Sequence, residues 1–250
     1  MRLRNALAML LAVDILAAGD FWTDREADQW SENEVKKIVT DSPWAQTASV
    51  DLRGDAGTIM NSWRHGGALD AAGAGGDESG GGGGPVLPKI VVRWESAAPI
   101  CQVCARSGLQ QYLFTCTAKL LYLSGLSRKF AELSEEFYIV SISNYPKIVP
   151  HWRGQEVPQH SAAANAALEE LGQRIRQLTF IGRKGKDPIR PAQVVVLPAG
   201  QGLLSIVFFP RTAAITLDDK QVLFESADGM IVVTSKFNLR KMIYKGKLEL

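Results

Sequence analysis

The sequence has few cysteines, few histidines and little excess charge. Its 250 residues include three cysteines, three histidines and a formal net charge of +2. Three cysteines are too few, and odd in number, for a disulfide framework, so a hydrophobic core must stabilise the fold. The small net charge gives no overall attraction to nucleic acid, and we expect no nucleic-acid partner.

Long apolar segments are also missing. After the first twenty residues, no apolar run reaches the length of about 18 residues that a transmembrane helix requires. The chain is 46% hydrophobic and 22% charged, with a mean hydropathy of −0.02, which is typical of a globular protein. These values exclude an integral membrane bundle, a fibre and a disordered tail.

The first nineteen residues have the order of a secretory signal. Arg2 and Arg4 precede an apolar stretch at 6–18, which ends in small residues at Ala17, Ala18 and Gly19. Asp14 interrupts the apolar stretch, and an N-terminal core helix is the alternative reading. We expect residues 1–19 to be a signal peptide and the protein to be periplasmic or secreted.

Glycine is abundant in one segment only. Of the 23 glycines, 10 lie between Gly66 and Gly84, so residues 54–84 are expected to form a flexible linker. A phosphate-binding loop would lead into a helix, whereas this tract leads into Pro85, Pro88 and a strand-like run. The tract separates an N-terminal arm at 20–53 from a single domain at 85–250.

Tryptophans characterise the arm. Ser31 and Glu34 form a capping box, which predicts a short amphipathic helix over 31–40. That helix is too narrow to bury Trp22, Trp30 and Trp44, so the arm must pack on the main domain or on a partner. Trp30 and Trp44 are therefore candidate binding residues. An edge strand is expected over 46–53.

The main domain mixes helical and β-branched patterns. Helices are predicted at 96–106, 126–137 and 161–178, and residues 110–123 are ambiguous. Strands are predicted at 88–95, 138–143, 179–181, 193–197, 203–209, 221–225 and 230–236. Asp228-Gly229 is a strong hairpin signal. The expected fold class is α+β, with a mostly antiparallel, hairpin-rich C-terminal sheet.

Cys101 and Cys104 have the spacing of a redox motif. They follow the strand-like run at 90–94, where a helix N-terminus could lower the pKa of the Cys101 thiol. The Trp-Cys-Gly-Pro-Cys sequence of such motifs is missing, and Gln102 and Val103 lie between the thiols. The alternatives are a thiol oxidoreductase, with Cys104 as the resolving thiol, and small buried cysteines on one helix face.

Other catalytic or metal-binding patterns are weak. His65, His151 and His160 lack metal-ligand spacing, and there is no Gly-x-Ser-x-Gly sequence, so we expect neither a metal nor a cofactor. Asp218-Asp219 is interpreted as a turn.

One segment is richer in Lys and Arg than the rest of the chain. It comprises Arg174, Arg176, Arg183, Lys184, Lys186 and Arg190, opposed only by Asp187. The arm and the start of the tract, 20–55, carry nine acids against four bases. The basic segment could bind an anionic partner through Arg183, Lys184 and Lys186, or it could be a solvated hairpin tip or pair with the arm. We favour the solvated or intramolecular reading.

Several short motifs carry a family resemblance. They are Phe21-Trp22, Gln29-Trp30-Ser31-Glu32-Asn33-Glu34-Val35, Asp41-Ser42-Pro43-Trp44-Ala45, Val92-Arg93-Trp94-Glu95-Ser96-Ala97, Arg183-Lys184-Gly185-Lys186, Phe209-Pro210-Arg211, Asp218-Asp219-Lys220 and Tyr244-Lys245-Gly246-Lys247-Leu248. With these motifs, the chain resembles an uncharacterised family of exported bacterial proteins. The resemblance implies export and a shared architecture, and it implies no activity.

The leading hypothesis is a non-enzymatic, exported binding or assembly module. Its partner is expected to be another protein or an anionic component of the cell envelope. The alternatives are a thiol-disulfide oxidoreductase that uses Cys101 and Cys104, and an anion-binding surface at Arg183–Lys186.

Overall fold

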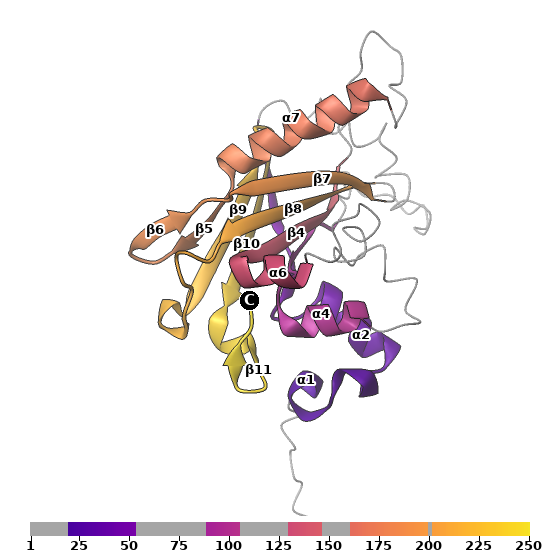
Figure 1. Cartoon of the computed structure of the whole chain (residues 1–250), viewed down its shortest axis with the longest axis vertical. Coiled ribbons are helices and arrows are strands. Elements are labelled where there is room, and N and C mark those ends of the chain that lie inside the picture. Colours follow the sequence, from indigo (N-terminus) through magenta and orange to yellow (C-terminus); the bar gives the residue numbers. More distant parts are fainter. Residues whose placement is uncertain (1–19, 54–88, 106–129, 147–160, 200–201) are drawn as a thin grey trace, which may run out of the picture.

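The computed structural model describes residues 20–53, 89–105, 130–146, 161–199 and 202–250. These residues form an α+β fold with antiparallel sheets, which confirms the predicted class (Figure 1). The signal-like segment, the glycine tract and all three histidines lie outside the described residues. No helix in the described part of the chain is long and apolar enough to cross a membrane.

Ten strands form two five-stranded sheets. Sheet A has the order β1 (Ala45–Thr47), β3 (Val91–Trp94), β4 (Phe137–Tyr145), β8 (Gly202–Pro210), β7 (Gln193–Ala199). Sheet B has the order β2 (Ser49–Leu52), β10 (Ile231–Asn238), β9 (Gln221–Ala227), β5 (Phe180–Arg183), β6 (Lys186–Ile189). A small hairpin, β11 (Ile243–Tyr244) and β12 (Lys247–Leu248), follows near the C-terminus.

The helices are mostly short. They are α1 (Phe21–Asp24), α2 (Glu32–Thr40), α4 (Ala98–Ala105), α6 (Phe130–Glu136) and α7 (Ala162–Leu178), with 3₁₀ turns η1 (Ala27–Gln29), η4 (Leu217–Asp219) and η5 (Leu239–Lys241). In α2, the Ser31 hydroxyl accepts from the Glu34 N–H while the Glu34 carboxylate accepts from the Ser31 N–H, as the capping box predicts.

Short connections link the edge strands of the two sheets on both sides. Ala48 alone separates β1 from β2, and residues 190–192 separate β6 from β7. Each of these four strands lies at the edge of its sheet. The sheets therefore form a flattened barrel in which each edge strand continues into an edge strand of the opposite sheet.

The main core fills the space between the sheets. Strand alternation directs Trp94 and Phe209 of sheet A toward Phe237 and Phe224 of sheet B. The rings of Trp94 and Phe237 have centroids 5.7 Å apart, and those of Phe209 and Phe224 are 6.2 Å apart. These edge-to-face contacts join the two sheets.

Helix α7 packs against β7 and β9 (Figure 1). Leu171 and Ile175 on its buried face belong to the main core, because the alanine-rich sequence places its large apolar residues on one side. The helix thus connects the outermost strand of sheet A with sheet B.

The other face of sheet A carries a second apolar cluster. Ile139, Leu204, Ile206 and Phe208 are buried there, and Leu133 of α6 packs against them. Sheet A is consequently buried on both faces in the described structure.

The N-terminal arm is integrated into the domain. Its strands β1 and β2 pair with β3 and β10, so the arm adds one strand to each sheet. Trp30 and Trp44 lie against Tyr244 of the C-terminal hairpin, with centroids 6.5 and 6.4 Å apart. The Trp44 indole N–H donates to the Glu249 carbonyl at 3.0 Å. The arm therefore packs on the domain itself.

Candidate functional site

The environment of Cys101 opposes a redox role. Its thiol is free and donates to the Glu95 carbonyl at 3.2 Å. Burial, with the nearby carboxylates of Glu95 and Glu249, raises the pKa of Cys101 to about 12, whereas a redox nucleophile needs a lowered pKa. Cys104 is disulfide-bonded, but Cys101 is not its partner, so the two do not form the internal disulfide of a redox motif.

We predict that Cys101 is chemically inert in the folded protein. Since its thiolate is scarcely populated at neutral pH, alkylation by iodoacetamide should be much slower than in urea, where the thiol has its ordinary pKa. Insulin reduction by the wild type should equal that of Cys101→Ser. Rapid labelling of the native protein, or a loss of insulin reduction in the variant, would restore the oxidoreductase hypothesis.

A buried ion pair lies on the outer face of sheet A. Arg93 and Glu95, both at most 2% exposed, lie two residues apart, so their side chains share that face. The Arg93 Nε lies 2.7 Å and its Nη2 2.6 Å from Glu95 Oε1. Ser141 donates to the same oxygen at 2.5 Å, and Arg93 Nη1 donates to the Val39 carbonyl at 3.2 Å. The network joins α2, β3 and β4 and is closed to solvent.

Cations from three separate segments meet at one end of sheet B. The β5–β6 hairpin places Arg183 opposite Val222 at the start of β9. The same start of β9 lies beside the end of β10, where Gln221 pairs with Asn238. We call this region the basic end; it comprises Arg183, Lys184, Lys186, Lys220, Arg240 and Lys241.

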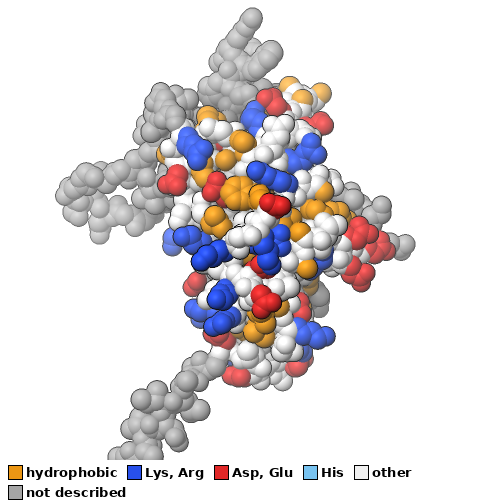
Figure 2. Space-filling model, turned by 90° about the vertical axis from the view of Figure 1, so that its left-hand side faces the viewer, with side chains coloured by type: hydrophobic (Ala, Val, Ile, Leu, Met, Phe, Trp, Pro, Cys, Tyr) orange, Lys and Arg blue, Asp and Glu red, His pale blue; other side chains and the backbone are white. Residues whose placement is uncertain are grey.

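The basic end has an excess of positive charge. Against its six cations stand three acids, Asp187, Asp218 and Asp219, whereas the whole chain has a net charge of only +2. Figure 2 views the molecule from the side of the β5–β6 hairpin and shows Lys and Arg side chains gathered over the middle of this face. The remainder of the chain is therefore slightly acidic, and the positive potential is concentrated at this end.

Two cations of the hairpin have partners within the chain. Arg183 donates to the carbonyls of Ala214 and Asp187, each at 3.1 Å. The Lys186 ammonium lies 2.6 Å from the Asp219 carboxylate. These partners come from the segment before β9 and from the hairpin itself, and not from the acidic arm that the intramolecular reading named. Lys184 is exposed at the tip.

The other cations of the basic end are exposed and have no ion pair among the described residues. They are Lys220, Arg240 and Lys241. Lys220 adopts φ 58°, a left-handed conformation that favours glycine or asparagine. The Leu239 N–H donates to its carbonyl at 3.0 Å, which fixes the β9 turn against η5.

The Asp219 carboxylate anchors turn η4. Burial alone would raise its pKa, but hydrogen bonds from Lys186 and from the Thr216 N–H at 3.0 Å lower it overall. Because the pKa is lower in the folded state, the ionised carboxylate stabilises the fold above its unfolded pKa, and this stabilisation is lost as the pH falls through the folded pKa.

Replacement of Asp219 by Asn should therefore have a pH-dependent effect. Near neutral pH, we expect the free energy of unfolding to fall by about 1–2 kcal/mol, because the charge-assisted contact with Lys186 is lost. The difference from wild type should begin to shrink as the pH falls below the ordinary Asp pKa of about 4 and should vanish as it falls through the lower pKa of the folded state. Urea titrations over this pH range would test it; a constant difference would contradict the assignment.

The other predicted basic residues do not join the basic end. Arg174 pairs with Glu170 at 2.7 Å, Arg176 donates to the Ala192 carbonyl at 3.5 Å, and Arg190 lies over the Phe180 ring at 5.2 Å. The acids of the arm pair elsewhere: Glu34 with Arg25, and Glu26 with Lys245. Hence the described contacts do not pair the basic hairpin with the arm.

The candidate residues Trp30 and Trp44 are core residues. They are 2% and 0% exposed, so neither offers a surface to a partner. Conversely, the sequence analysis missed Lys220, Arg240 and Lys241. The sequence does contain the motif Asp218-Asp219-Lys220, which could have pointed to Lys220. However, only the pairing of β5 with β9 shows that this motif lies beside the Arg183–Lys186 hairpin.

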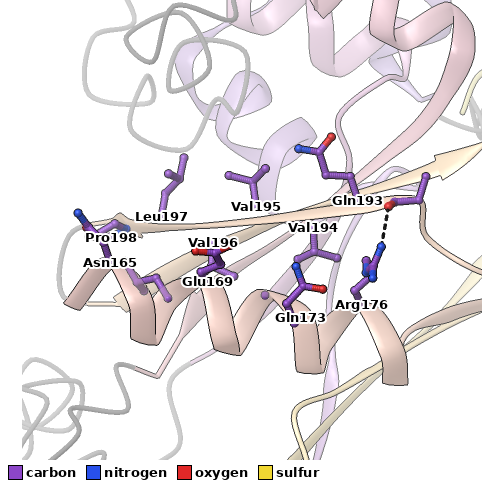
Figure 3. Close-up of a pocket in the computed structure, with 13 residues that line it drawn as sticks. Asn165, Glu169, Gln173, Arg176, Gln193, Val194, Val195, Val196, Leu197 and Pro198 are labelled. Carbon is purple, nitrogen blue, oxygen red and sulfur yellow. Dashed lines mark hydrogen bonds between the residues drawn. The ribbon is translucent and has the colours of Figure 1, made fainter. Parts of the chain in front are cut away.

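A groove of about 650 Å³ separates α7 from β7 (Figure 3). Val194 and Val196 face the helix, while Gln193, Val195 and Leu197 point to the opposite side of the strand. A Cβ atom on Gly172 would lie 3.6 Å from the Val194 carbonyl oxygen, so helix and strand are in close contact at that point. Asn165, Glu169 and Gln173 line the outer part, without a cluster of charge.

The described residues contain no group of three or more His, Cys, Asp or Glu side chains arranged to hold a metal ion. Comparison of the chain with protein-family models, curated proteins and solved structures gave no match.

Proposed function

We propose that the chain is a non-enzymatic, exported binding protein and that the basic end is its binding surface. The ligand class is an anionic component of the cell envelope. The convergence of cations from the β5–β6 hairpin, the start of β9 and η5 carries this proposal. The signal-like order of the first nineteen residues supports export.

Most of these cations have no ion-pair partner in the described part of the chain, which supports a binding role for them. An ion pair within the chain already satisfies Lys186, whereas Lys220, Arg240 and Lys241 remain exposed without an ion pair in the described structure. Exposed cations that share one end of a rigid sheet present several donors at once to a polyanion, and their attractions add. The centre of the proposed site therefore shifts from Arg183–Lys186, which the sequence offered as an alternative, toward Lys220 and η5.

Charge reversal at the centre tests the proposal. We expect Lys220→Glu, Arg240→Glu and Lys241→Glu together to abolish salt-sensitive retention on heparin, a soluble polyanion. The matched control reverses three exposed cations elsewhere, Lys36, Arg53 and Lys89, and changes the net charge by the same amount. Retention of the control close to the wild-type level supports a local site, and equal losses in both variants would show a non-specific charge effect.

The thiol-disulfide alternative has no such support. The partly buried, protonated thiol of Cys101 and the separate disulfide of Cys104 both disfavour it.

A further inference from the structure

One of the two exposed large hydrophobic residues in the described structure lies within the basic end. Leu217 is 43% exposed and belongs to η4, the turn that contains Asp218 and Asp219 and leads to Lys220. The other, Leu178, is 44% exposed at the end of α7, next to the opposite end of β5 from Arg183. Unlike Leu178, Leu217 belongs to a turn that contacts the cation-bearing hairpin and packs against η5.

Turn η4 holds Leu217 in a fixed place. The Asp219 carboxylate accepts from the Thr216 N–H, and the Lys220 N–H donates to the Leu217 carbonyl at 3.0 Å. The ion pair with Lys186 attaches the turn to the β5–β6 hairpin, and η4 packs against η5. The exposed side chain is therefore carried by an anchored turn, which contacts the hairpin through Lys186 and packs against η5, the element that bears Arg240 and Lys241.

From this arrangement we infer that the basic end docks on a membrane that carries anionic phospholipid, with Leu217 inserted at the boundary between headgroups and acyl chains. The inference rests on the proposed function and specifies its ligand. Cations attract the anionic headgroups, and an apolar side chain among them gains free energy only where a hydrocarbon phase is within reach. A soluble polysaccharide offers the same negative charge but no such phase, so it leaves Leu217 without a role.

Two probes distinguish the sources of negative charge. The first is sedimentation with vesicles of phosphatidylcholine and phosphatidylglycerol, compared with phosphatidylcholine alone. The second is retention on heparin. The wild type should bind the anionic vesicles and not the neutral ones, and it should bind less at high salt.

Leu217→Ser should weaken binding to anionic vesicles by about fivefold, because a polar side chain then replaces the leucine that inserts at the boundary between headgroups and acyl chains. Its retention on heparin should not change. Leu178→Ser, at an equally exposed leucine, is the matched control and should bind both probes as the wild type does. Leu217→Trp should bind the vesicles more tightly, because an indole partitions well into the membrane interface, and loss of folding cannot mimic such a gain.

The outcomes separate the two proposals. If Leu217→Ser and Leu217→Trp leave vesicle binding unchanged while the Lys220, Arg240 and Lys241 reversal removes it, membrane insertion is wrong and the anion-binding function stands. Equal effects of Leu217→Ser on both probes would also overturn insertion. If the triple reversal alters neither probe, the proposed function itself fails.

Discussion

Replacement of Glu95 by alanine is expected to lower the free energy of unfolding by about 3–5 kcal/mol, one of the two largest effects we predict. Among the described residues, Glu95 is the only carboxylate that contacts Arg93, which is itself 2% exposed. Without it, a guanidinium would remain buried with the Val39 carbonyl as its remaining hydrogen-bond partner in the described structure. Urea unfolding followed by circular dichroism measures the change.

A double replacement separates the cost of an unpaired charge from the value of the pair. Arg93→Met with Glu95→Leu removes both charges and keeps the volume apolar, so it should be less destabilising than Glu95→Ala. Ser141 then loses its acceptor but can rotate its hydroxyl toward another group. A double variant as unstable as the single one would show that the pair itself stabilises the fold, and a single variant that costs less than about 1 kcal/mol would show that water reaches Arg93.

The second large effect concerns Trp44. Trp44→Ala should cost about 3–5 kcal/mol, because it leaves a cavity at the contact between the arm and the C-terminal hairpin. The side chain is fully buried, lies edge-to-face with Trp22 and Tyr244, and donates to the Glu249 carbonyl. Thermal and urea unfolding would measure the loss.

A graded variant keeps this prediction specific. Trp44→Phe retains most of the ring packing and loses the indole N–H, so its cost should be about 1–2 kcal/mol and well below that of alanine. Leu178→Ala, at an exposed leucine, should have little effect and serves as the control. Equal losses for Trp44→Phe and Trp44→Ala would show that the bond to Glu249, rather than the ring packing, holds the arm.

Elements with strong local signals could be predicted from the sequence. The Ser31–Glu34 capping box gives α2, and the alanine-rich amphipathic pattern gives α7, because both depend on neighbours within a few residues. The Asp228-Gly229 turn joins β9 and β10, with Gly229 at φ 102°. Strand β6 was missed because Lys186, Asp187 and Pro188 resemble a loop tip, although an edge strand tolerates a proline.

The candidate site could be predicted only in part. The hairpin Arg183–Lys186 is visible as a charged run, but its proximity to Lys220 and Arg240 follows from the pairing of β5 with β9 and of β9 with β10. The β9–β10 hairpin is local, but the β5–β9 pairing connects residues about forty positions apart, which no local pattern encodes. For Cys101, the spacing suggested reactivity, whereas burial decides the pKa and burial depends on the whole fold.

The arm and the C-terminal hairpin together determine when the chain can finish folding. Strands β1 and β2 need β3 and β10 as partners, and Trp44 needs Glu249, which precedes the last residue. The earliest described segment therefore has to wait for the latest described segment before the barrel can close. Such long-range closure makes folding slow compared with helical proteins of this size.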